Sequence, residues 1–403
     1  MKEKSIVITS ALRTAIGSFN GALKNMQAHD LGKFVIKESI KNSKLKLDEI
    51  DEVIMGQVLT SASGQNPARQ AAINAGVPIE KTAYVINQVC GSGLRSVASG
   101  YQSIISNDSK IVIAGGQESM SNAPHAVHFR NGKKLEEKDL IDTMIKDGLW
   151  DAFNGYHMGV TAENVAEKYQ ITRNDQDNFA LNSQKKAIKA IGENRFKEEI
   201  IPIKLKDQKI FDKDEYPRSD TNLEKLSNLK TVFKENGTVT AGNSSGLNDG
   251  AAALVLMNRK EAELRKIEPL VKIVSWATCG VEPSLMGLGP IPATNLALKK
   301  AGWQINDVDL FEINEAFAAQ SIAVIKDLKI PKEIVNVNGG AIALGHPIGA
   351  SGARILVTLI HEMIKQNKSK GCATLCIGGG MGIAMCIAVS YTHLRAHETE
   401  ADL

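Results

Sequence analysis

The chain has 403 residues, of which 43% are hydrophobic and 23% are charged, and its formal net charge is +3. This length predicts two or three domains, and this composition is typical of a soluble globular protein. The small net charge argues against a nucleic-acid partner, and the apolar runs are too short for a membrane span. No signal or transit peptide is recognisable. Five cysteines in so long a chain predict free thiols in a reducing compartment, so we expect a cytoplasmic protein.

Short runs of β-branched residues alternate with helical patterns in the first part of the chain, which is typical of α/β architecture. The predicted strands and helices there are Ser5–Ser10, Leu31–Lys41, Glu52–Leu59, Arg69–Ala75, Ala83–Val89, Ser92–Ile105 and Lys110–Gly115. From Gln117 to about Asn248 we expect a polar, loop-rich insertion with a helix over Asn174–Ala190 that Thr172 caps. The alternation then returns in the predicted elements Ala251–Met257, Val271–Ala277, Thr294–Ala301, Val308–Ile313, Ala350–His361 and Gly371–Ile377.

The second half of the chain repeats the first. Three pairs of segments are similar and keep their order, namely Leu47–Gly56 with Ile305–Asn314, Cys90–Gly100 with Gly349–Leu359, and Ser109–Met120 with Gly371–Gly382. This pattern indicates a duplicated α/β unit with an insertion after the first copy. We therefore expect a site where the Gly-rich turns of the two copies face each other.

Cys90 stands in QVCGSGLR, between a predicted strand and the start of a predicted helix. The dipole and the unpaired N–H groups of a helix N-terminus lower the pKa of a thiol and can hold an oxyanion, which favours a nucleophile. A lone cysteine is more often a small buried hydrophobe beside a turn. GSGLRS also begins like a dinucleotide fingerprint, but Ser96 stands where that motif needs Gly or Ala.

Two further residues are candidates for proton transfer. His346 is held between Gly345 and Pro347 before another Gly-rich helix start, so it is either a general base or a histidine that caps a turn. Cys376 ends a predicted buried strand. Cys372 on that strand lies about 13 Å away at ~3.3 Å per residue, too far to share a zinc ion, and we expect no metal site.

A hydrolase motif is the remaining alternative. Residues 242–246 read G-x-S-x-G around Ser244, and Asp249 and His346 follow in the chain order of a hydrolase triad. The nucleophile elbow of such enzymes needs a strand before the serine and a helix after it. Because a predicted strand, Ala251–Met257, follows instead, we interpret the motif as a coincidence.

Together these segments resemble the thiolase family, and within it the short-chain acetyl-CoA acetyltransferases. The resemblance covers residues 1 to about 388, and its motifs are NQVCGSG around Cys90, NEAFA at Asn314–Ala318, GGAIALGHPIGASG at Gly339–Gly352 and CIGGGMG at Cys376–Gly382. It implies an α/β fold of duplicated, thiolase-like βαβαβαββ halves stacked as α-β-α-β-α layers. The halves would be 1–116 plus 249–268 and 269–389, with a CoA-binding loop domain at 117–248.

The resemblance also implies a mechanism. Cys90 would accept an acetyl group from acetyl-CoA while His346 takes its proton. Cys376 would deprotonate a second acetyl-CoA, and the enolate would be stabilised by His346 and by a water that Asn314 holds. The N–H groups of Cys90 and Gly378 would hold the acyl carbonyl. The products would be acetoacetyl-CoA and CoA, with thiolysis as the reverse reaction and no cofactor beyond these CoA thioesters.

Other family positions concern substrate and assembly. The residues matching substrate or CoA contacts are His157, Met158, Arg218, Phe233, Ser245 and Phe317. Of these, His157 and Met158 would shorten the acyl pocket. Residues 125–140 match a segment that joins dimers into tetramers, so we expect a homodimer or homotetramer. Residues 390–403 follow no thiolase pattern, and we interpret them as an appended, non-native tail.

Three alternatives to this function stay open. One is a degradative 3-ketoacyl-CoA thiolase of broad chain-length range. A β-ketoacyl synthase-like enzyme would share the fold and the nucleophile, but that family uses a second histidine or an asparagine where this chain has Cys376. A non-enzymatic scaffold is disfavoured because all four catalytic residue types are present.

Overall fold

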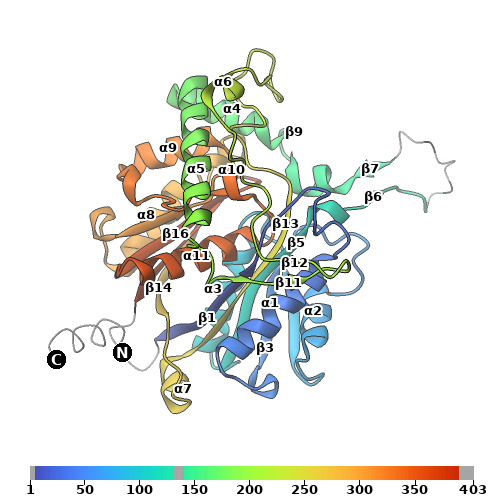
Figure 1. The fold of residues 1–403 in the computed structure, drawn as a ribbon, viewed down its shortest axis with the longest axis vertical. Helices are drawn as coiled ribbons and strands as arrows, with labels where there is room; N and C mark the ends of the chain where they lie inside the picture. The colour runs from blue at the N-terminus through green and yellow to red at the C-terminus, as the bar shows by residue number, and fades with distance from the viewer. Residues whose placement is uncertain (1–4, 131, 133–135, 137–139, 390–403) are drawn as a thin grey trace.

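The computed structural model describes residues 5–130, 132, 136 and 140–389 (Figure 1). The segment 390–403 and part of the expected tetramer segment 125–140 lie outside the described residues. In the described part of the chain, no helix is long and apolar enough to cross a membrane.

One long sheet runs through the molecule. The first half of the chain supplies β1 (Ile6–Thr14), β3 (Glu52–Gly56), β4 (Thr82–Ile86), β5 (Ile111–Ser119) and β13 (Asn248–Asn258). The second half supplies β14 (Val271–Gly280), β15 (Leu310–Ile313), β16 (Lys370–Ile377) and β17 (Met381–Val389). Their order is β4-β3-β5-β13-β1-β14-β17-β16-β15, with the short strands β2 (Gly17–Ser18) and β10 (Ile200–Ile201) at the side of β13 and β1.

The strand order confirms the duplication. Reading outward from the β1–β14 contact, β1-β13-β5-β3 in one half corresponds to β14-β17-β16-β15 in the other. β4 pairs in parallel with β3, and at the matching place Val335 forms a parallel bridge with Phe311 of β15. The two halves therefore present equivalent turns at equivalent strand ends.

Helices cover both half-sheets and separate them. The first half contributes α1 (Ala28–Asn42), α2 (Pro67–Ala75) and α3 (Ser92–Ile105), and the second contributes α8 (Pro290–Ala301), α9 (Ala318–Leu328), α10 (Ala341–Leu344) and α11 (Ser351–Lys365). The central core holds α3 and α11 side chains such as Val97 and Leu356 together with strand residues of both halves. Separate cores lie under α1 and α2 and under α8 and α9. The expected α-β-α-β-α layers are confirmed.

Two glycines let α3 and α11 cross at backbone distance. A Cβ on Gly93 would lie 2.7 Å from the Ala353 nitrogen, and a Cβ on Gly352 would lie 2.4 Å from the Leu94 nitrogen. Because any side chain here would push the helices apart, the close crossing depends on glycine at both positions. It brings the N-terminal ends of the two helices, and the turns before them, together.

The insertion packs over the end of both halves (green in Figure 1). Its elements are β6 (His125–Ala126), β7 (Ile141–Asp142), a π-helical turn (Met144–Leu149), β8 (Trp150–Asp151), β9 (Tyr156–His157), α4 (Met158–Tyr169), α5 (Arg173–Gly192), β11 (Ile203–Lys204), β12 (Ile210–Phe211) and α6 (Leu223–Ser227). The expected helix is α5, and Thr172 Oγ1 caps it by accepting from the Asp175 N–H at 3.1 Å. After the insertion, α7 (Arg259–Leu264) leads into the second half.

Two predicted strands run beyond the observed strand ends, and the predicted start of the insertion falls inside β5. β3 ends at Gly56 rather than Leu59, because the Val58 and Leu59 N–H groups turn away to donate to Glu118. β4 ends at Ile86 rather than Val89, which has φ +45° in the left-handed region. The domain boundaries stay a prediction.

Candidate active site

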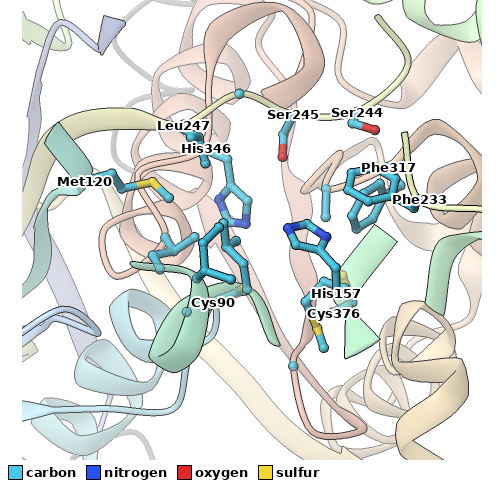
Figure 2. A pocket seen from close by; sticks show the side chains of 18 of the residues that line it. Cys90, Met120, His157, Phe233, Ser244, Ser245, Leu247, Phe317, His346 and Cys376 are labelled. Atoms are coloured by element: carbon cyan, nitrogen blue, oxygen red, sulfur yellow. The ribbon is translucent and has the colours of Figure 1, made fainter. Parts of the chain in front are cut away.

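A cavity of about 340 Å³ opens where the two Gly-rich turns meet. Figure 2 shows Cys90, His346, His157 and Cys376 gathered around it. The predicted site residues in its lining are Cys90, His157, Met158, Phe233, Ser245, Phe317, His346, Cys376 and Gly378. They come from both halves and from the insertion, so the fold brings together residues that are far apart in the chain.

A tight turn holds Cys90 in front of α3. Ser92 Oγ accepts from the Gln88 N–H at 2.8 Å and donates to the Val89 carbonyl at 2.6 Å. Val89 has φ +45°, a conformation that costs a β-branched residue on the order of 1–3 kcal/mol. The turn's own hydrogen bonds hold this strained residue, and the strain turns the chain so that Cys90 faces the cavity.

The Cys90 thiol is protonated at neutral pH. Its pKa lies at about 11, because burial raises it more than the N–H groups of Gly378 and of Cys90 itself lower it, and the Glu118 carboxylate adds a smaller rise. The sequence predicts a lowered pKa from the helix N-terminus. The structure differs because loss of solvent around the sulfur outweighs the backbone N–H groups. Cys90 therefore needs a base.

His346 is held from three sides. Its backbone N–H donates to Asn248 Oδ1 at 2.8 Å, and its Nδ1 lies 2.5 Å from Ser351 Oγ. Ser351 Oγ donates to the Pro347 carbonyl at 2.9 Å, so its single proton is used there and it accepts from Nδ1–H. Asn314 Nδ2 lies 3.4 Å from His346 Nε2. We assign the Nδ1–H tautomer on this basis, which leaves a lone pair on Nε2.

The electrostatics of His346 keep its ring neutral. Its pKa lies at about 3, lowered chiefly by burial and also by the Arg354 cation, so the resting imidazole is a weak base. The imidazole is therefore neutral at working pH and can accept a proton at Nε2. Asn314 is itself fully buried, and its Oδ1 has no hydrogen-bond partner within the described residues. A free acceptor beside Nε2 is a suitable place for a water molecule.

Cys376 ends β16 next to a wall of apolar side chains. It belongs to one buried cluster with Met158, Met286 and Phe317. Burial raises the pKa of the Cys376 thiol far above its ordinary value, and the neighbouring Cys90 raises it further. The resting thiol is therefore a proton donor, and it becomes a strong base once its proton has gone.

The remaining walls are aromatic and apolar. The His157 ring stacks on Phe233 at 4.6 Å between centroids, and Phe233 meets Phe317 edge-on at 6.4 Å. His157 Nδ1 accepts from the Gly159 N–H at 3.0 Å, so its Nε2 carries the proton. Met158 Sδ lies 3.4 Å from the position that a Cβ on Gly378 would occupy. Methionine therefore packs close to the backbone that faces Cys90.

Two other candidates stand apart from this chemistry. Arg218 is not among the residues that line the cavity, and its guanidinium lies over the ring of Tyr216 at 5.6 Å. Ser244 lines the cavity, but its hydroxyl donates to the Thr240 carbonyl at 2.8 Å. The strand β13 follows Ser244, as expected from the sequence, so the elbow geometry of a hydrolase is absent here.

Several lining residues were not predicted from the sequence. They form an apolar wall beside Cys90 and are Met120, Ile145, Leu149, Leu247 and Ile348. Ile145 and Leu149 come from the π-helical turn, for which the sequence carries no recognisable signal. Ser351 and Glu118 were also missed. Glu118 did carry a signal, since an acid stands near the end of a strand that begins with apolar and small residues.

Comparisons with known proteins agree with one another. A family model described as "Thiolase, N-terminal domain" matches residues 6–260, and "Thiolase, C-terminal domain" matches residues 267–389. The acetyl-CoA acetyltransferase of Rhizobium meliloti is 59% identical over 390 residues, which are 96% of this chain and 99% of that protein. The cytosolic acetyl-CoA acetyltransferase of Rattus norvegicus is 54% identical over 387 residues, 95% and 98% of the two chains. The crystal structure of the Bacillus anthracis acetyl-CoA acetyltransferase matches with a TM-score of 0.94 at 45% identity, covering 96% of this chain and 99% of that one.

Proposed function

Because this chain belongs to the thiolase family, we propose that it is an acetyl-CoA C-acetyltransferase. It condenses two acetyl-CoA into acetoacetyl-CoA and CoA, and it catalyses the reverse thiolysis. The main support is that two thiols, Cys90 and Cys376, and the neutral imidazole of His346 share one cavity. Joining two thioesters needs a nucleophile that holds one acyl group and a base that deprotonates the other. This cavity supplies both.

The first half-reaction forms the acetyl-enzyme. His346 Nε2 takes the Cys90 proton as the sulfur attacks the thioester carbonyl of acetyl-CoA. The bond from carbon to the CoA sulfur breaks, and Cys376 gives its proton to the leaving sulfur, which departs as the CoA thiol. The Nδ1–H group of the imidazolium stays hydrogen-bonded to Ser351 Oγ. The products are acetyl-Cys90, a thiolate at Cys376 and free CoA.

The second half-reaction forms the carbon–carbon bond. The Cys376 thiolate removes an α-proton from a second acetyl-CoA, and the enolate oxygen accepts from His346 Nε2–H and from a water on Asn314. The enolate carbon attacks acetyl-Cys90, acetoacetyl-CoA forms, and the departing Cys90 sulfur regains its proton from His346. Cys376 has then replaced the proton that it gave to CoA with the α-proton, and Cys90 and His346 are back in their starting protonation states, so no cofactor is consumed.

Backbone donors would stabilise the acyl carbonyl. The N–H groups of Cys90 and Gly378 lie close enough to the Cys90 sulfur to lower its pKa. In the acetyl-enzyme these donors would face the carbonyl oxygen, where negative charge develops. Removal of one oxyanion donor typically slows a reaction by about 10²–10³-fold.

The cavity walls favour short acyl groups. His157 and Met158 line the cavity, Met158 is buried, and Met158 packs in the same cluster as Cys376. A longer acyl chain would have to displace these packed side chains. We therefore propose a short-chain enzyme, rather than a degradative thiolase of broad range.

We also propose that the enzyme is cytoplasmic and assembles as a homodimer or homotetramer. β4 stands at one edge of the main sheet, and no described strand pairs with its outer side. Thr82 and Tyr84 of this strand are exposed. An uncovered edge strand is available for pairing with a second copy. Analytical ultracentrifugation would measure the assembly.

The test of the function is direct. Purified protein is mixed with acetoacetyl-CoA and CoA, and loss of the enolate absorbance of acetoacetyl-CoA is followed. We expect CoA-dependent cleavage to acetyl-CoA, with no cleavage by the Cys90→Ser protein. Absence of cleavage by a folded wild-type protein would refute the proposal.

A further inference from the structure

The mechanism above uses no carboxylate, yet a buried one lies close to it. Glu118 is on β5, opposite Gly250 of β13, and its side chain is fully buried. Its Oε2 accepts from the Val58 N–H at 3.0 Å and from the Gly349 N–H at 2.9 Å, and its Oε1 accepts from the Leu59 N–H at 3.2 Å. Three backbone donors from two separate segments therefore converge on one carboxylate.

These two segments carry parts of the site. Gly349 belongs to the turn between His346 and α11, and the preceding Ile348 lines the cavity. Val58 and Leu59 pack with Ile348 in one apolar cluster, against which Cys90 also packs. Glu118 thus joins the His346 turn to the wall beside Cys90. A Cβ on Gly349 would lie 2.7 Å from Glu118 Oε2, so the approach is as close as the backbone allows.

We propose that Glu118 is a positioning residue, whose ionised carboxylate fixes the His346 turn against the Val58–Leu59 wall beside Cys90, so that His346 Nε2 can take the Cys90 thiol proton. Only an ionised carboxylate offers two acceptor oxygens to three N–H groups, and a protonated acid or an amide turns a donor toward one of them. A shift of about 1 Å in a catalytic group can cost about 10²-fold in rate. The proposal rests on the proposed function, because its readout is thiolysis.

Charge supports the geometry. The pKa of Glu118 lies at about 7, because burial raises it more than the three N–H groups lower it, and Asp249 on β13 adds a smaller rise. Cys90, with a thiol pKa of about 11, also interacts electrostatically with Glu118. Protonation of Glu118 would loosen the turn, so activity should fall as the pH drops through about 7.

The test compares Glu118→Gln with wild type and with Glu163→Gln. Glu163 is a matched control, because it is also a buried glutamate whose carboxylate accepts from backbone N–H groups, those of Thr238 and Val239. These partners belong to neither the His346 turn nor the Cys90 turn. For each folded protein, kcat and KM for CoA are measured in thiolysis from about pH 6 to pH 8, a range centred on the Glu118 pKa of about 7.

We expect Glu118→Gln to lower kcat at pH 8 by about 10- to 100-fold with KM for CoA changed by less than about twofold. The fall of kcat through about pH 7 should be present in wild type and in Glu163→Gln and absent in Glu118→Gln. Glu118→Asp, which keeps the charge, should keep the pH dependence.

Two results would overturn the inference. One is a Glu118→Gln protein with kcat within about twofold of wild type; the other is a lowered kcat with an unchanged pH profile, as a merely structural role would give. If Glu118→Gln does not fold, the pH profiles of wild type and Glu118→Asp still test the inference. It requires kcat to fall through about pH 7 in both proteins. An inactive wild type would refute the proposed function. An active wild type, with kcat unchanged in Glu118→Gln, would refute only the role of Glu118.

Discussion

The contact between Ser351 and His346 gives a quantitative prediction. In Ser351→Ala the His346 Nδ1–H loses its acceptor, which lies at 2.5 Å in a fully buried position. A buried donor left without a partner costs about 1–3 kcal/mol. The ring can avoid this cost by moving its proton to Nε2, but that tautomer cannot accept the Cys90 proton.

At about 1.4 kcal/mol for each factor of ten, this cost predicts a fall of about 10- to 100-fold in kcat. Because His346 acts in both half-reactions, acetyl transfer to Cys90 and acetoacetyl-CoA thiolysis should fall together. The assays are rapid-quench acetylation with labelled acetyl-CoA and steady-state thiolysis.

Ser96→Ala is the matched control. Ser96 is a fully buried serine on α3 whose hydroxyl contacts the Gly93 and Gly115 carbonyls at 2.8 and 2.6 Å, and it does not touch His346. We expect its kcat within about threefold of wild type, as for loss of one ordinary hydrogen bond. A Ser351→Ala protein as active as Ser96→Ala would refute the assigned tautomer.

Three further predictions concern the second thiol, the pocket and the fold. Cys376→Ala should still acetylate Cys90, only more slowly, because CoA can leave as a thiolate without the Cys376 proton. It should lose condensation by several orders of magnitude, and equal loss of both steps would show a wrong role for Cys376. Thiolysis should be efficient for acetoacetyl-CoA, weak for 3-ketohexanoyl-CoA and minimal for 3-ketodecanoyl-CoA, because displacing packed atoms costs ~1–3 kcal/mol against ~0.8 kcal/mol gained per buried methylene. Met158→Ala should restore part of the six-carbon activity, and equal efficiency for ten carbons in wild type would exclude a short-chain pocket. Gln170→Gly at the end of α4, where Gln170 has φ +53°, should raise the free energy of unfolding by roughly 0.5–1 kcal/mol in urea titrations, whereas Gln170→Ala should not.

Local patterns in the sequence predicted most of the fold. The repeated segments anticipated the equivalent strand orders of the two halves, and Thr172 marked the start of α5. The ends of β3 and β4 were misjudged because apolar residues recur shortly after them, at Val58 and Leu59 and at Val89. At Val89 the tertiary structure overrides local preference, since a β-branched residue is held with φ +45°.

For the site, residue types were predictable and environments were not. Gly-rich turns pointed to Cys90, His346 and Cys376, which all line the cavity. The pKa of Cys90 was predicted in the wrong direction, because desolvation depends on which side chains the fold packs around the sulfur. The partners of Glu118 are likewise far from it in sequence, so its three backbone bonds could not be seen before the fold was known.

The measurement that tests the account most directly is the site of covalent acetylation. Wild-type protein is incubated with radiolabelled acetyl-CoA, quenched in acid, digested and mapped by mass spectrometry. The account predicts one acetyl group on Cys90, stable to acid and released by hydroxylamine, that disappears when CoA is added. Label on Ser244, which shares the cavity, or no covalent label in an active enzyme, would contradict it.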